Sequence, residues 1–412
     1  MTNFDVIEAY TEDFTKWTYR NSRGTAKITN NTIVITNVVE TNNIVEDDNE
    51  PYSDLTIRVT GVTENKYLIV RQGRGKPETH IKKDGVYTFK DNNLYFGFGV
   101  SVIGECNITI TQLPTSILKD LSGNGNHAYL YGGKGKLNSG MGVYQQDFSK
   151  LIISRVDKKQ DPFSFTVSGS GGSYLAYMQL GNWNNKAFKI LANINAKSDY
   201  LYLRFRNSTD AVITSVMLKN GENIIPAQNI EGATKAVFEY SLKEGETITI
   251  TQIPDYPDQL CYDGKMYAIA YGMPILTDYT IITDRTWFKD KINSWSYFVD
   301  KKRAFTFERT GNGKLFNAMS FAAETVIELQ KDGVSYQTKA SYNGNAINYH
   351  SDQADNGDML VIGSTKDSLG NQCFIGCHSD ILIFNRTLTE YEISWVKNNM
   401  MCSKQQEHDI DL

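Results

Sequence analysis

The chain has 412 residues, with 42 Lys and Arg against 47 Asp and Glu, which gives a formal net charge of −5. This balance argues against a nucleic-acid partner, because no basic excess is present to displace the counterions of phosphates. A hydrophobic content of 40% with 22% charged residues is sufficient for packed cores, and the length predicts about two to four domains.

The start of the chain and the cysteines indicate where the protein is made. Residues 1–8 contain neither a basic region nor an apolar run, and no stretch approaches the roughly 18 apolar residues of a membrane helix. The five cysteines are an odd, scattered set, unlike a disulfide framework. We therefore expect no export signal, no membrane insertion and synthesis in a reducing cytoplasm.

Short runs rich in Thr, Ile and Val dominate the first part of the chain and predict strands. Each is bounded by Asn, Asp, Gly or Ser, which is typical of an all-β sandwich. The clearest runs are 32–36, 55–59, 66–70 and 107–111.

These strands recur further along the chain. The segment 105–114 (ECNITITQLP) returns as 244–254 (EGETITITQIP), and the runs within 54–71 resemble those within 189–205. Strand order and spacing agree as well. The repeat predicts two related β-sandwich modules, at 1–113 and 160–254.

A cluster of aromatic and amide side chains follows the second module. Stacking of a sugar ring on an exposed indole, with amides bonding hydroxyls, would suit a glycan site. The alternative is that these residues belong to the core. The candidate glycan-binding residues are Trp287, Asn293, Trp295 and Tyr297.

The acidic residues beyond 320 are candidates for catalysis and for metal binding. Glu324 and Glu328 would lie about 13 Å apart on one strand face, farther than the roughly 6.5–9.5 Å of an inverting glycosidase. We therefore expect no enzyme. Asp352, Asp355 and Asp358 crowd one loop that fails the EF-hand pattern, which leaves a nonstandard calcium site or a solvated loop.

Cys373, Cys377 and His378 could suggest zinc. A structural zinc site usually has four ligands, however, and these residues fall in an apparent strand. Buried thiols acting as small hydrophobic groups are the favoured interpretation.

One helix is predicted, near the C-terminus. Thr389 and Glu392 form a capping-box pattern, and Ile393, Val396 and Met400 share one helical face. Arg386, just before this helix, is expected to pair with a carboxylate across the final strand.

Two motifs resemble the laminin-G-like, concanavalin A-type jelly-roll family. The first is the opening DLSGNGNH at 120–127, and the second is the closing LIFNRTLTEYEI at 382–393. The resemblance implies a discontinuous jelly roll of 115–159 plus 255–402, with the 160–254 module inserted into it and a polar tail at 403–412.

The resemblance also implies a function. Members with Asn-rich strands and no export signal are typically head or tail appendages of bacteriophages. It thus implies a non-enzymatic virion protein, a fibre or decoration protein, made in the host cytoplasm. Its partners would be capsid, portal or tail proteins, itself as a dimer or trimer, and host-surface polysaccharide. The alternatives are a lectin-like carbohydrate-binding module and a polysaccharide hydrolase.

Overall fold

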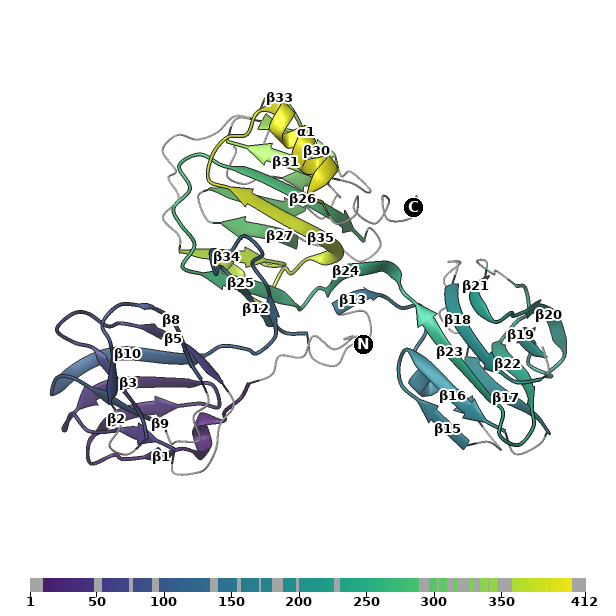
Figure 1. Cartoon of the computed structure of the whole chain (residues 1–412), viewed down its shortest axis with the longest axis horizontal. Helices are drawn as coiled ribbons and strands as arrows, with labels where there is room; N and C mark the ends of the chain where they lie inside the picture. The colour runs from purple at the N-terminus through teal and green to yellow at the C-terminus, as the bar shows by residue number, and fades with distance from the viewer. Residues whose placement is uncertain are drawn as a thin grey trace. The chain divides into compact units, whose positions relative to one another are not determined.

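The structure of the chain is a computed structural model (Figure 1). It describes residues 10–47, 54–73, 77–90, 96–133, 140–153, 157–169, 172–179, 188–197, 200–225, 230–288, 296–301, 304–309, 314–316, 326–328, 334–339, 341–346 and 358–401.

The fold class is all-β, as predicted. The described strands form six sheets in which every paired strand is antiparallel, and the one α-helix of the described residues is α1 (Glu390–Asn399). No helix in this part of the chain is long and apolar enough to cross a membrane.

Two five-stranded sheets form the N-terminal sandwich. In segments 32–38, 55–60 and 104–112, the alternation of Thr with Ile or Val places one side of the strand in a shared core and the other toward solvent. The first sheet has the order β1 (Thr18–Tyr19), β4 (Val45–Glu46), β9 (Phe96–Val100), β6 (Leu68–Gln72) and β7 (Glu78–Ile81). The second has the order β2 (Gly24–Ile28), β3 (Thr32–Val38), β10 (Gly104–Gln112), β5 (Leu55–Thr60) and β8 (Gly85–Phe89).

Two more five-stranded sheets form the inserted sandwich around a core of their own. The first has the order β14 (Ile152–Ile153), β17 (Gly172–Gln179), β22 (Lys235–Leu242), β19 (Leu201–Arg206) and β20 (Val212–Met217). The second has the order β15 (Asp157–Gln160), β16 (Ser164–Ser168), β23 (Thr247–Ile253), β18 (Phe188–Asn195) and β21 (Gly221–Ile225).

The two sandwiches have the same strand order, strand for strand. Each also opens with a single 3₁₀ turn, η1 (Phe14–Lys16) or η2 (Phe148–Lys150), capped by Asp13 or Asp147. The predicted start of the second module at residue 160 is too late, because β14 and β15 pair with β17 and β16.

The remaining strands form the large sandwich. One sheet has the order β11 (Ile117–Leu118), β12 (Ala128–Tyr131), β25 (Tyr267–Tyr271), β34 (Met359–Ile362), β27 (Ser296–Lys301), β28 (Phe305–Arg309), β29 (Lys314–Phe316) and β30 (Val326–Glu328). The other has the order β13 (Gly140–Val143), β24 (Asp255–Asp263), β35 (Ile375–Phe384), β26 (Thr280–Trp287), β31 (Val334–Thr338), β32 (Ser341–Tyr342) and β33 (Asn345–Ala346).

Side chains from both sheets meet inside the large sandwich. The ring of Phe298 on β27 lies 5.0 Å from Phe374, and the ring of Tyr279 lies 5.1 Å from Phe305 on β28. Arg285 on β26 is also buried there, with its guanidinium 4.9 Å from the centre of the Phe307 ring.

The opening motif forms a compact turn. The carboxylate of Asp120 accepts hydrogen bonds from the backbone N–H groups of Ser122 and Asn126, both at 2.9 Å. Gly123 and Gly125 have positive φ values, as expected for turn glycines. Nδ1 of His127 accepts the N–H of Asp120 at 3.0 Å, which gives this histidine a structural role.

The chain divides into two compact units. One contains residues 136–261, and the other contains residues 5–135 and 262–412.

Candidate functional site

The predicted glycan-binding tryptophan of β26 lies in the core. Trp287 is only 6% exposed, and its indole packs edge-on against Phe374 at 4.7 Å. It offers no ring face to a sugar, which corrects its assignment to a glycan site. Tyr297 is half-buried on β27, and its backbone N–H donates to the carbonyl of Gln372. Asn293 and Trp295 lie outside the described residues.

Of the three candidate calcium ligands, one falls on a described residue. Asp358 is exposed just before β34, and its backbone carbonyl accepts the N–H of Met273. Asp352 and Asp355 lie outside the described residues. In the part of the chain that the structure describes, no group of three or more His, Cys, Asp or Glu side chains could hold a metal ion.

Cys373, Cys377 and His378 are all buried. Nε2 of His378 lies 3.1 Å from the hydroxyl of Tyr262, and burial lowers the pKa of this imidazole to about 4. Burial likewise raises the pKa of the Cys373 thiol. A neutral imidazole among apolar side chains and buried thiols is a core arrangement, as the interpretation of buried thiols predicted.

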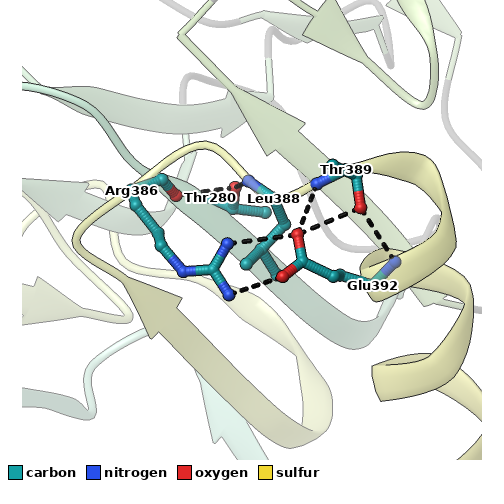
Figure 2. A network of polar contacts seen from close by, with 5 residues as sticks. All are labelled: Thr280, Arg386, Leu388, Thr389 and Glu392. Atoms are coloured by element: carbon teal, nitrogen blue, oxygen red, sulfur yellow. Dashed lines mark hydrogen bonds and ion pairs between the residues drawn. The ribbon is translucent and has the colours of Figure 1, made fainter.

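The closing motif builds a polar network at the start of α1 (Figure 2). The guanidinium of Arg386 donates to both carboxylate oxygens of Glu392, at 2.7 and 3.1 Å. Glu392 also accepts the backbone N–H of Thr389, while its own N–H donates to the Thr389 hydroxyl. These bonds complete the predicted capping box and lower the pKa of Glu392 to about 2. The expected partner of Arg386 was a carboxylate across the final strand, but the structure pairs Arg386 with the first turn of the helix.

The same network ties α1 to the large sandwich. The hydroxyl of Thr280 on β26 donates to the carbonyl of Arg386 at 3.0 Å and accepts the N–H of Leu388 at 2.8 Å (Figure 2). One face of α1 then packs on the outer side of β26 and β31 through the cluster of Ile282, Tyr336, Leu388, Ile393, Val396 and Met401. Met400, predicted for this face, is 43% exposed, and Met401 is buried instead.

The opposite face of α1 exposes two aromatic rings. Tyr391 is 79% exposed and Trp395 is 51% exposed, and we call these two residues the α1 aromatic pair. Residues four apart on a helix are neighbours, with Cβ atoms about 5–6 Å from one another. Ser394 and Asn398 are exposed on the same face and add a hydroxyl and an amide.

Sequence reasoning could have found this pair. With Ile393 and Val396 assigned to the buried side, the 100° step per residue places Tyr391 and Trp395 toward solvent. The capping box had already indicated where the helix begins. The tryptophan chosen from the sequence was the wrong one because indoles near Asn and Asp occur both in cores and at surfaces.

Comparisons with known proteins add little to this geometry. The sequence matches no protein-family model, and no curated protein matches it. Among solved structures, the chain is similar to Trypanosoma rangeli sialidase in complex with 2,3-difluorosialic acid (covalent intermediate), with a TM-score of 0.28 and 9% identity over 92% of this chain and 84% of that chain. It is also similar to a mutant of Trypanosoma rangeli sialidase displaying trans-sialidase activity, with a TM-score of 0.25 and 8% identity over 95% and 96% of the two chains.

These matches correct the functional expectation. Both structures are described as sialidases, whereas the sequence implied a non-enzymatic structural protein of a phage particle, so that prediction is wrong. TM-scores this low do not establish a shared fold, so no residue role is transferred from either structure. The resemblance to laminin-G-like jelly rolls stays a prediction.

Proposed function

We propose that this chain is a non-catalytic carbohydrate-binding protein whose sugar-binding surface is the α1 aromatic pair. The observation that carries the proposal is the exposure of Trp395 and Tyr391 on the solvent face of a helix whose other face is buried. Large aromatic side chains are usually well buried, so two exposed neighbours indicate a ligand surface.

The chemistry of this face suits a neutral sugar. A flat ring can cover the apolar C–H face of a pyranose, while Ser394 and Asn398 supply donors and acceptors for its hydroxyls. Residues 391, 394, 395 and 398 carry no charge, which favours a neutral glycan over an acidic one.

The helix is also held in one orientation before any ligand arrives. Its first turn is fixed by Arg386, Thr389 and Glu392, and its inner face by Ile393 and Val396. A preorganised surface loses little conformational entropy on binding, so two rings can give useful affinity.

The test is a glycan array with the full-length chain, followed by titration calorimetry with the best glycan. Trp395→Ala should weaken binding at least tenfold, and Trp395→Phe, which retains a ring, should restore part of it. Met400→Ala is the matched control, because this side chain is exposed at the C-cap of the same helix, away from the pair.

Three results would contradict the proposal. The first is the absence of binding to every glycan tested, and the second is binding by Trp395→Ala that equals that of the unmodified chain. The third is the release of reducing ends from a bound polysaccharide, which would make the protein a hydrolase.

A further inference from the structure

The edge strand β20 of the inserted sandwich is open to a further strand. It lies at the end of its sheet beside β19, and among the described residues no strand pairs with its other side (Figure 1). Val212, Ile213 and Met217 are 43%, 42% and 50% exposed, and the strand contains no charged residue. An uncharged edge strand with exposed apolar side chains is a template for pairing with another chain.

In the N-terminal sandwich, the equivalent edge strand β7 is protected against such pairing. This strand has only four residues, and the exposed ones are Glu78, Thr79 and His80. Glu78 also forms an ion pair with Arg71 on the neighbouring strand, with Nε to Oε1 at 2.7 Å.

Strand register identifies the equivalent positions. Glu78 lies opposite Arg71, and in the inserted sandwich Ser215 lies opposite Arg204. Two residues further along, Met217 in β20 takes the position of His80 in β7. The inserted copy therefore has Ser and Met at the two positions where the first copy carries polar, ionisable side chains.

The other edges of the inserted sandwich are protected. β14 has two residues, β15 contains Asp157, Lys158 and Lys159, and β21 contains Glu222. Short length and charge are the usual ways in which edge strands avoid association. β20 has neither.

We propose that β20 pairs antiparallel with β20 of a second copy of this chain, so that the two five-stranded sheets become continuous. A two-fold axis perpendicular to the sheet keeps both outer faces on one side. With the axis at Ser215, Ile213 lies opposite Met217 of the second copy and Thr214 lies opposite Val216. Ser215 faces its own equivalent, as a hydroxyl pair flanked by apolar pairs.

The sequence of β20 suits pairing with the same strand of a second copy. Read outward from Ser215, its residues are apolar or hydroxyl-bearing in both directions, so antiparallel self-pairing creates no like-charge contact. Because a single strand pair forms a small interface, the dimer is expected to be weak and to depend on concentration.

The first experiment is sedimentation equilibrium of the full-length chain over a concentration series, without sugar. The unmodified chain should show a monomer–dimer equilibrium. The double variant Ser215→Glu with Met217→His, which carries the residues of the N-terminal edge, should weaken dimerisation at least tenfold. Arg204 is in place to pair with the new carboxylate as Arg71 does with Glu78, so the variant should keep its fold, checked by circular dichroism.

A second experiment tests the register. Ser215→Cys should form an intermolecular disulfide under mild oxidation, because the two thiols meet at the axis. Glu222→Cys, on β21 at the edge of the other sheet of the sandwich, is the matched control and should not. Ile103→Ser removes an exposed apolar side chain of the N-terminal sandwich and should leave the dimer unchanged.

A monomer at every concentration would overturn the proposal, as would a dimer that survives the double variant or a Glu222→Cys disulfide as efficient as that of Ser215→Cys. The result is independent of the proposed sugar site, because Trp395→Ala should dimerise like the unmodified chain.

Discussion

The N-terminal and inserted sandwiches share their strand order but differ on the outer face of the first sheet. In the N-terminal copy, β9 carries Gly97 and Gly99, and the segment before β4 crosses directly over them: Asn43 is 6% exposed and accepts a hydrogen bond from Arg71 at 2.7 Å. A Cβ atom on Gly97 would lie only 2.1 Å from Nδ2 of Asn43.

The inserted copy fills the equivalent positions with side chains. Val70 pairs with Phe98 in the first copy and Leu203 pairs with Phe238 in the second, so Val237 and Glu239 take the places of the two glycines. The carboxylate of Glu239 accepts hydrogen bonds from Tyr200 at 2.6 Å and from Arg206 at 2.7 Å.

What the two copies retain is their shared frame. In each, an Asp-capped turn inserts a fully buried phenylalanine into the core, where Phe14 contacts Phe98 and Phe148 contacts Phe238. In each, a buried glutamine of the last strand, Gln112 or Gln252, bonds the backbone just before that turn. The buried phenylalanine and the glutamine hydrogen bonds are thus common to both copies, whereas the outer face of the first sheet and its edge strand differ between them.

The largest expected effect tests this shared frame. Phe14→Ala and Phe148→Ala should each destabilise their own sandwich by about 3–5 kcal/mol, because both rings are fully buried. Hydrogen exchange of peptides from each sandwich is the measurement, since a multidomain chain does not unfold in one step. Equal losses of stability would show that the two phenylalanines have the same role. A near-neutral effect in one copy would show that they do not.

A second prediction tests the glycines. Gly97→Val introduces the residue of the inserted copy, and it should cost about 1–3 kcal/mol because Asn43 must move and lose its bond to Arg71. Gly85→Ala is the matched control, since a Cβ there meets nothing closer than 3.5 Å. Hydrogen exchange of peptides covering β4 and β9 reports the change. Equal effects of the two variants would mean that the close approach of Asn43 is unimportant.

The strands of the repeat could be predicted from sequence for a physical reason. In segments such as 107–111, Thr and Ile alternate with a period of two, so the pattern fixes both the strand and its buried face. The start of the second copy was missed because β15 reads DKKQ, which has no apolar alternation. Only the short similarity between EDFTK at 12–16 and QDFSK at 146–150 marks it.

The burial of Trp287 could not be predicted, because its strand lacks the alternation that marks the strands of the repeat. Strand β26 is covered on both faces. The second sheet covers one face, and α1 covers the other, where Ile282 packs against the helix. Seven of the eight residues of the strand are therefore buried. Alternation disappears in such a strand, and sequence alone cannot separate core from surface. Helix α1 keeps its period, which is why Tyr391 and Trp395 could have been found.

The smallest expected effect concerns position 12, where the copies differ by one charge. Glu12 in the first copy corresponds to Gln146 in the second. Partial burial raises the pKa of Glu12, and the charge of nearby Asp47 raises it further, while a hydrogen bond from the Trp17 indole opposes both effects. A raised pKa means that the folded state binds the proton more tightly than the unfolded state. The side chain therefore favours folding at low pH, and this contribution is lost as the pH rises through the folded-state pKa.

Glu12→Gln removes this titration and introduces the residue of the inserted copy. The backbone bonds of residue 12 to Gln112 remain, so at neutral pH the variant should be more stable by about 0.5 kcal/mol or less. The gain should fade toward acid pH, where Glu12 itself is neutral. Hydrogen exchange of the N-terminal sandwich at two pH values measures it, with Gln146→Glu as the reciprocal variant. A gain from Glu12→Gln that persists unchanged at low pH would show that size or hydrogen bonding, and not charge, separates the two copies here.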